Sequence, residues 1–149
     1  MARFKQDIDP YAEASWLAWF DGSAKPNPGK CHIACILKGK DGEIFTQTRH
    51  IGDGDSSDAE YQALIAALEL IALHVTPSSR ESVLLRGDSQ VVINDVLGSE
   101  KNAATRLHPY RIRALALLSH LPNIRLKWIP RHKNTEADAL MRQQIDIKS

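Results

Sequence analysis

The sequence predicts an α/β domain with a mixed β-sheet and the element order βββαβααβα. Three strand-like segments separated by turns occupy the chain before residue 52. The segment 82–87 is a short apolar run that leads directly into a helical segment, as a buried strand does in a strand–helix–strand crossover. One more strand-like run interrupts the helical segments that follow. Three strands in succession, followed by alternating helices and strands, are typical of an α/β domain.

The first three strands are bounded by turn-forming residues. Trp16–Asp21 is aromatic and apolar and stops at an Asp-Gly pair, which favours a turn. The Pro26–Gly29 segment suits neither a helix nor a strand, so the second strand is expected over Cys31–Lys38. A turn at Gly39–Gly42 then leads to a third strand over Glu43–Ile51.

The remaining elements are predicted from helical periodicity and from proline. A helix should begin at Ser57, because apolar residues spaced like one helical face follow it, and it should end before Pro77. Those apolar residues are Leu64, Ala67, Leu68, Ile71 and Val75. The later elements are expected as a strand over 82–87, helices over 89–97 and 104–121, a strand over 123–129 and a helix over 135–145.

Length and composition suit one globular domain, which we place at residues 15–146 after an irregular extension at 1–14. The chain has 149 residues, of which 43% are apolar and 25% charged. Its apolar runs are shorter than the roughly 20 residues that cross a bilayer, and its first residues lack the apolar core of a secretory signal. We therefore expect a cytoplasmic protein with no membrane partner. The sequence specifies no protein partner, and we expect a monomer.

Charge and cysteine usage restrict the possible functions. The net charge of +1 is too small to hold nucleic acid by general phosphate neutralisation, so any such contact must be local. Cys31 and Cys35 lie about 13 Å apart along one strand, so they cannot form a disulfide and are expected to be buried. Basic residues gather in two clusters, each of which taken alone is more often a solvated face. The clusters are Arg106, His108, Arg111 and Arg113, and Arg125, Lys127, Arg131, His132 and Lys133.

The candidate catalytic residues are four acids: Asp21, Glu60, Asp88 and Asp138. The sequence contains no phosphate-binding glycine loop, zinc-ligand spacing or nucleophile elbow. Three of the acids have simple structural alternatives. Asp21 precedes a glycine as in a turn, Asp88 precedes a helix as an N-cap does, and Asp138 lies in a first helical turn, where the helix dipole favours acids. Asp88 also lies just beyond the carboxyl end of a buried strand, where α/β sheets place their sites.

Glu60 has two competing interpretations. Ser57 and Glu60 have the spacing of a capping box, which would give Glu60 a purely structural role. However, Glu60 also precedes four stripe residues by 4, 7, 8 and 11 positions, so its side chain lies on the buried side of the helix and needs a partner there. Four converging carboxylates would repel one another. Divalent cations that prefer oxygen ligands, above all Mg²⁺, would relieve this repulsion.

Five segments of the chain together form a recognisable pattern: Phe20–Ser23 with Asn27–Gly29, Ala59–Leu64, Asp88–Gln90, Trp128–His132 and Asn134–Leu140. In their order and spacing they resemble type 1 ribonuclease H, in the form that lacks the basic handle helix of many bacterial members. The resemblance implies a ribonuclease H-like fold with a five-stranded mixed sheet in the order 3-2-1-4-5, flanked by helices. It also implies an endonuclease that cleaves the RNA strand of RNA/DNA hybrids and leaves 5′-phosphate and 3′-hydroxyl ends.

The same resemblance implies a role for each acid. Asp21 would bridge two Mg²⁺ ions, for which Mn²⁺ can substitute. Asp138 would complete the site that activates the attacking water. Glu60 and Asp88 would hold the second ion, which stabilises the leaving 3′ oxygen.

The resemblance extends to residues that contact the substrate. Asn27 and Gln90 match family positions that contact the RNA strand, where the 2′-hydroxyl distinguishes RNA from DNA. Without the resemblance, a turn residue and a solvated first-turn residue are the better interpretations. His132 matches a loop histidine that assists proton transfer or product release, although the segment 132–138 is shorter than in many members. The alternative for His132 is an exposed loop histidine.

The chain departs from many bacterial members where the handle would lie. Residues 97–109 form only a short connection there. Arg106, Arg111 and Arg113 are candidates to replace part of the handle, and we expect weaker hybrid binding with steep salt dependence. Two other functions are compatible with the sequence. One is a catalytically silent nucleic-acid-binding module, which would gain nothing from four acids facing phosphate. The other is a nuclease acting on double-stranded RNA or on DNA.

Overall fold

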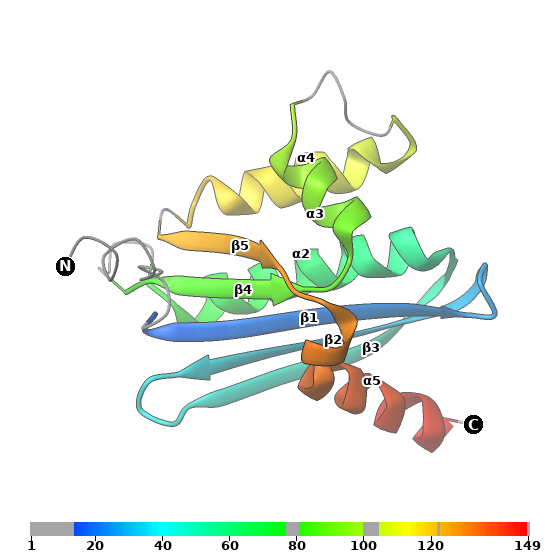
Figure 1. Ribbon diagram of the computed structural model, residues 1–149, viewed down its shortest axis with the longest axis horizontal. Helices are drawn as coiled ribbons and strands as arrows, with labels where there is room; N and C mark the ends of the chain where they lie inside the picture. The colour runs from blue at the N-terminus through cyan, green and yellow to red at the C-terminus, as the bar shows by residue number, and fades with distance from the viewer. Residues whose placement is uncertain (1–13, 77–80, 100–104, 122, 149) are drawn as a thin grey trace.

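In the part of the chain that the structure describes, five strands form one mixed sheet (Figure 1). The computed structural model describes residues 14–76, 81–99, 105–121 and 123–148. The strands are β1 (Trp16–Lys25), β2 (Gly29–Gly39), β3 (Ile44–Gly54), β4 (Val83–Gly87) and β5 (Ile124–Trp128). Their order is β3-β2-β1-β4-β5, with antiparallel pairs on the β3 side of β1 and parallel pairs on the β5 side. The expected sheet order is confirmed.

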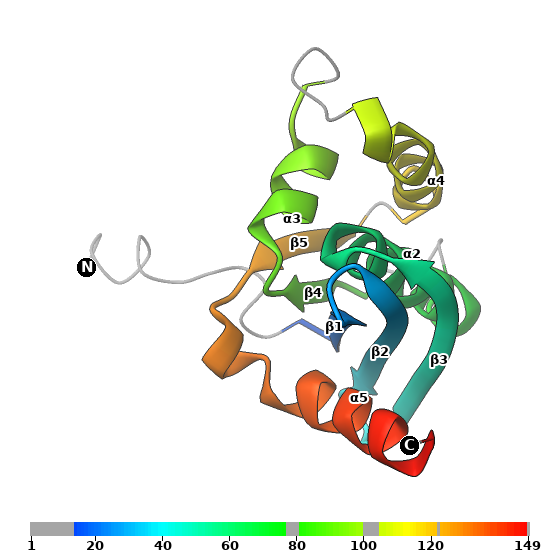
Figure 2. The same ribbon diagram turned by 90° about the vertical axis from the view of Figure 1, so that its right-hand side faces the viewer.

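Helices cover both faces of the sheet (Figures 1 and 2). On one face lie α2 (Ser56–His74), α3 (Gln90–Leu97) and α4 (His108–Leu118), and on the other lies α5 (Thr135–Lys148), against β1 and β2. The main core lies between α2 and the sheet. Its fully buried members include Phe20, Ile33, Leu37, Leu64, Leu68, Ile71 and Leu85. Each such side chain contributes about 1.5–3 kcal/mol through burial, so this layer holds α2 firmly against the strands.

Strand β1 runs further than the sequence predicts. The Asp-Gly pair predicted a turn after Asp21, and that prediction is wrong. β1 continues because its residues stay paired with β2, with Asp21 opposite Ala34 and Lys25 opposite Lys30. The turn falls at residues 26–28 instead. Asp21 therefore lies within a hydrogen-bonded strand, and the side chains of residues 21, 23 and 25 share one face of it.

The helix expected over 104–121 is a 3-10 turn followed by a shorter α-helix. The turn η2 spans Thr105–Leu107, and α4 begins at His108 because Pro109, which lacks an N–H, fits only a first helical turn. Residue 104 lies outside the described residues. A second 3-10 turn, η3 (Arg131–Lys133), lies between β5 and α5.

The remaining structural expectations concern the cysteines and the ends of the chain. Cys31 and Cys35 are buried and form no disulfide, as predicted. Burial raises the pKa of the Cys35 thiol to about 12, so it stays protonated. None of the described helices is long and apolar enough to cross a membrane. The expected extension at 1–14 lies outside the described residues, apart from its last residue.

Candidate active site

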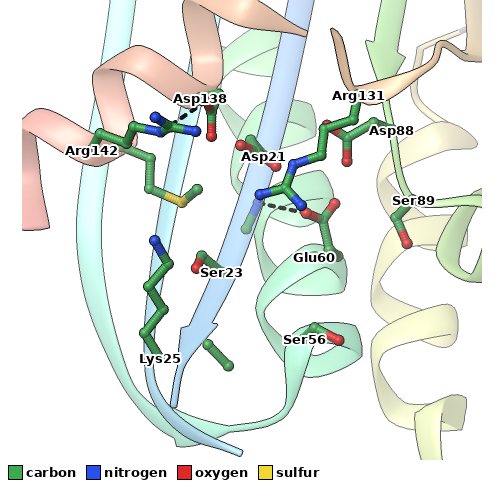
Figure 3. A pocket seen from close by; sticks show the side chains of 13 residues that line it. Asp21, Ser23, Lys25, Ser56, Glu60, Asp88, Ser89, Arg131, Asp138 and Arg142 are labelled. Carbon is green, nitrogen blue, oxygen red and sulfur yellow. Dashed lines mark hydrogen bonds and ion pairs between the residues drawn. The ribbon is translucent and has the colours of Figure 1, made fainter. Parts of the chain in front are cut away.

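An open pocket beyond the end of β4 brings together all four candidate acids (Figure 3). Asp21 comes from β1, Glu60 from α2, Asp88 from the residue after β4, and Asp138 from α5. The pocket has a volume of about 400 Å³. β1 and β4 are parallel neighbours, so both run towards this edge of the sheet, and α2 and α5 approach it from opposite faces. The acids thus meet at one rim of the sheet, as the sequence predicted.

Glu60 reaches the pocket because α2 packs very close to β1. A Cβ atom at Gly22 would lie 2.4 Å from the backbone of Ala59, so only glycine permits the approach. The Gly22 amide donates a hydrogen bond of 2.8 Å to Oε1 of Glu60. The second oxygen, Oε2, is buried and has no hydrogen-bond partner among the described residues. An unpartnered buried carboxylate oxygen next to other carboxylates is well suited to bind a cation.

The predicted capping box at Ser57 and Glu60 is wrong, because the cap lies two residues earlier. Asp55 is the N-cap of α2, and its side chain accepts from the Asp58 amide at 2.9 Å. The Asp58 side chain accepts in return from the Asp55 amide, also at 2.9 Å. This pair performs the reciprocal capping expected of Ser57 and Glu60. Glu60 therefore lies in the second turn and has no capping role.

Asp88 is held in place by the segment around β5 and α5. It does not cap α3, because that role belongs to Ser89, whose hydroxyl accepts from a first-turn amide at 3.3 Å. Asn134 is fully buried, and its Nδ2 donates to the Phe20 carbonyl at 2.9 Å and to Oδ2 of Asp88 at 3.1 Å. The Trp128 indole donates to the Asp88 carbonyl at 3.1 Å. The position of Asp88 is therefore set by residues far along the chain.

Three of the four acids form a tight cluster. Asp21, Glu60 and Asp88 each place one oxygen within 4.8 Å of the others. Asp138 lies beside them in the pocket and forms an ion pair with Arg142, with 3.0 Å between Oδ2 and Nε. This donor set consists of carboxylate oxygens alone, which suits hard cations such as Mg²⁺ and Mn²⁺. With the unpartnered Oε2 of Glu60, these residues fit a divalent metal.

Burial and mutual repulsion raise the pKa values of the three clustered acids. Burial is the largest cause of the rise in the pKa of Asp21 to about 7; the Glu60 side chain opposes this rise, and the charges of Asp88 and Asp138 add to it. Burial and the neighbouring Asp21 raise the pKa of Glu60 well above its ordinary value. Burial also raises the pKa of Asp88, although the Asn134 hydrogen bond opposes the change. A bound cation would reverse these shifts by favouring the charged forms.

Three cationic side chains lie around the acids: Lys25 from β1, Arg131 from η3 and Arg142 from α5 (Figure 3). The charge of Arg131 lowers the pKa values of both Asp21 and Asp88, and so offsets part of their rise. The cations thus bring positive charge to a pocket that acids would otherwise make strongly negative.

The arginines expected to replace the handle bind other parts of the protein. Arg111 is buried and donates to the backbone carbonyls of Asp95 at 3.0 Å and Gly98 at 2.8 Å, so its predicted role is wrong. Arg113 pairs with Glu69 at 3.2 Å, and Arg106 pairs with both acids of the α2 cap, at 2.9 and 3.0 Å. None of these arginines lines the pocket.

The other predicted site residues lie next to the pocket, and none of them lines it. Asn27 is exposed and bound to Ser56, a lining residue. Its Oδ1 accepts from the Ser56 amide at 3.1 Å, and its Nδ2 donates to the Ser56 hydroxyl at 3.3 Å. Gln90 is the exposed first residue of α3, directly after the lining residue Ser89. His132 is exposed in η3, one position after a lining arginine.

Comparison with known proteins places the chain in a family. The model of the reverse transcriptase-like family matches residues 19–144. The crystal structure of RNase H1 from the archaeon Halobacterium salinarum has a TM-score of 0.77 to this chain at 35% identity, covering 88% of this chain and 97% of that one. This chain belongs to the type 1 ribonuclease H family. The ribonuclease HI of that archaeon is 35% identical over 130 residues, covering 87% of this chain and 63% of that protein.

Two further structures share the ribonuclease H fold. LC11-RNase H1, solved in complex with an RNA/DNA hybrid, has a TM-score of 0.78 at 27% identity and covers 89% of this chain and 98% of its own. The N-terminal RNase H domain of Rv2228c from Mycobacterium tuberculosis has a TM-score of 0.73 at 27% identity. The match covers 86% of this chain and 96% of that domain's chain. Our chain spans less than two thirds of the halobacterial ribonuclease HI and 34% of the full-length bifunctional Rv2228c.

Sequence reasoning assigned no role in this ribonuclease H pocket to Asn134, Arg131, Arg142 or Lys25. In the sequence, Asn134 and Arg131 stand within two of the segments that resemble the family, and Arg131 also belongs to a basic cluster, but neither pattern indicates a contact with the acids. A signal for Lys25 was present, because it lies four residues after Asp21 and shares its face in a continuous strand. The strand end predicted at Asp21 hid that relationship.

Proposed function

We propose that this protein is a metal-dependent endonuclease that cleaves the RNA strand of RNA/DNA hybrids. The observation that carries the proposal is the convergence of Asp21, Glu60 and Asp88 within 4.8 Å, with Asp138 in the same pocket. A ribonuclease HI among the relatives, and an RNase H1 solved with an RNA/DNA hybrid, support the substrate class. The cationic rim around the acids is consistent with a polyanionic substrate.

In this proposal the four carboxylates would hold two Mg²⁺ ions, for which Mn²⁺ can substitute. Asp21 would serve both ions, Asp138 would complete the site on the side of the attacking water, and Glu60 and Asp88 would complete the site on the side of the leaving group. Two such ions supply an activated water and stabilise the charge that develops on the leaving 3′ oxygen. In-line displacement leaves a 5′-phosphate and a 3′-hydroxyl.

The protein's own charges prepare the pocket for this chemistry. Asp138 contacts Arg142 through Oδ2, so a cation bound by Asp138 would share this carboxylate with the arginine. Asp21, whose pKa is about 7, must lose its proton. The hydrogen bond from Asn134 and the charge of Arg131 keep Asp88 closer to its ionised form, because both lower its pKa.

Three further residues are proposed to recognise the substrate or to assist its turnover. Asn27 and Gln90 carry amide groups that can donate to and accept from a 2′-hydroxyl, the group that distinguishes RNA from DNA. The Asn27–Ser56 hydrogen bonds fix the first of these beside the pocket. His132 is exposed in η3, directly after the lining residue Arg131, and this position suits a role in proton transfer or product release.

The test compares three labelled substrates: an RNA/DNA hybrid, duplex RNA and duplex DNA, each in Mg²⁺, in Mn²⁺ and in EDTA. We expect cleavage of the RNA strand of the hybrid alone, with 5′-phosphate ends and no product in EDTA. Cleavage of only duplex RNA or duplex DNA would refute the substrate assignment. Tight hybrid binding without any cleavage would instead identify a catalytically silent binding module.

A further inference from the structure

The pocket extends beyond the carboxylates along β1, towards the β1–β2 turn. Asp21, Ser23 and Lys25 alternate along the strand, so their side chains project to the same side. All three line the pocket, and Figure 3 shows the Lys25 ammonium group directed along it towards Ser23 and α5. Met141 and Arg142 of α5 also line the pocket, and Figure 3 shows Arg142 beside Asp138, on the side towards which the Lys25 ammonium group is directed. This extension has the polar end of β1 on one side and Arg142 of α5 on the other.

Lys25 and Arg142 are the two cations of this extension. Lys25 is exposed and forms no ion pair with any of the residues that the structure describes. Arg142 pairs with Asp138 through Nε, and its side chain is 64% exposed. A guanidinium has five N–H donors in a planar fork, so Arg142 can hold Asp138 and still donate to a second acceptor. Both side chains therefore have donors available to a bound anion.

The distribution of charge in the pocket indicates which anion this is. A nucleic-acid strand whose scissile phosphate lies over the acids must place its neighbouring phosphates next to the same carboxylates, which repel them. Positive charge beside the acids is needed to offset that repulsion. Lys25 and Arg142 supply it on one side of the cluster, and Arg131 supplies it on the other (Figure 3).

We propose that Lys25 and Arg142 form a subsite for one backbone phosphate of the bound nucleic acid, next to the phosphate that lies at Asp21, Glu60 and Asp88. The inference rests on the proposed function, since it takes the acids as the place of cleavage. It assigns to this chain a local phosphate contact formed by the end of β1 and by α5, away from the region where the handle of other members would lie.

The first experiment measures binding without cleavage. Affinity for a fluorescent RNA/DNA hybrid is determined by anisotropy in EDTA over a series of KCl concentrations, for the wild type and for Lys25→Gln. Loss of one phosphate contact should weaken binding about 3- to 10-fold at low salt and reduce the slope of log K against log [salt] by about 1. Lys40→Gln removes the same charge at the β2–β3 turn, at the other end of the sheet, and should leave the slope unchanged. Equal effects of the two substitutions would overturn the proposal.

The second experiment identifies the phosphate. Hybrids are made with a single neutral methylphosphonate at each position around the cleavage site, and each is bound by the wild type, Lys25→Gln and Arg142→Gln. At one position next to the scissile bond, the methylphosphonate should weaken wild-type binding but cause little further loss in either variant. Additive losses at every position would refute the subsite.

The two proposals can fail separately. If the hybrid is cleaved but the losses are additive at every position, the subsite is wrong and the catalytic proposal stands. If Lys25 and one phosphate are coupled in binding but the hybrid is not cleaved, the subsite stands and the chain is a binding module. Circular dichroism of each variant confirms that these exposed substitutions leave the fold intact.

Discussion

The Gly22 amide donates a 2.8 Å hydrogen bond to the Glu60 carboxylate, and this contact joins β1 to α2 at the centre of the acid cluster. It exists because Gly22 has no Cβ, which allows the backbone of α2 to approach the strand. The same contact leaves the second carboxylate oxygen of Glu60 without a partner, beside Asp21 and Asp88. One glycine thus determines where the Glu60 carboxylate lies.

Gly22→Ala should therefore damage the fold and the metal site together. The new Cβ would lie 2.4 Å from the α2 backbone, so the helix must shift, at a cost of about 1–3 kcal/mol of unfolding free energy. Glu60 would move with α2, and Mn²⁺ affinity measured by calorimetry should fall at least tenfold. Leu73→Ala, at an exposed position of α2 outside the pocket lining, is the control and should change neither quantity appreciably. Unchanged stability in Gly22→Ala would contradict this account.

Asp21→Asn should abolish hybrid cleavage and at the same time stabilise the metal-free protein at pH 8. The raised pKa of Asp21, about 7 against an ordinary 3.8, means that ionisation costs the folded state stability as the pH rises through that range. The neutral amide avoids the cost, which we expect to be on the order of 2 kcal/mol, or about 5 °C in Tm. At pH 4.5 the gain should largely vanish, because Asp21 is then protonated in the wild type. Wild-type turnover in this variant would refute the site assignment.

Metal binding should release protons and strengthen with pH. The pKa values of Asp21, Glu60 and Asp88 are raised, so the metal-free cluster holds protons near pH 6 that a divalent ion must displace. Affinity for Mg²⁺ should therefore rise from pH 6 to pH 8. Calorimetry in two buffers with different ionisation enthalpies measures the protons released, and we expect about one at pH 6.5. Proton release that stays at zero from pH 6 to pH 8 would show that the carboxylates are already ionised.

Arg131→Gln should shift the pH dependence of Mg²⁺ binding to higher pH. The Arg131 charge lowers the pKa values of Asp21 and Asp88, so its removal should keep both protonated to higher pH and weaken Mg²⁺ binding near pH 7. Lys133→Gln removes a charge from the same exposed turn, outside the pocket lining, and serves as the control. Identical pH profiles for the two variants would argue against a local effect of Arg131.

Asn134→Ala should destabilise the protein and leave the Asp88 side chain less firmly positioned. The substitution leaves the Phe20 carbonyl without its partner and removes a hydrogen bond to Asp88, in a site that is fully buried. We expect a loss of about 2–4 kcal/mol in urea denaturation, together with weaker Mn²⁺ binding. Gln143→Ala, an exposed change in α5, should alter neither. Metal affinity equal to that of the wild type would limit Asn134 to a structural role.

The sequence by itself determined the order of the elements and the buried side of α2. Both follow from local chemistry, because the spacing of the apolar residues from Leu64 to Val75, and the position of Glu60 relative to them, depend only on the helical period. The same reasoning identified four acids at strand ends and helix starts. It also predicted that Cys31 and Cys35 would be buried and unpaired, since their spacing along a strand forbids a disulfide.

Tertiary structure decided the rest, wherever residues distant in the chain compete with a local signal. The local turn signal at Asp21 gave way to pairing of β1 with β2, which also placed Lys25 in the pocket. The Gly22–Glu60 hydrogen bond spans 38 positions of the chain, and the bonds of Asn134 to Asp88 and Phe20 span 46 and 114. No local pattern encodes such contacts, because they form only when the packed sheet brings the segments together.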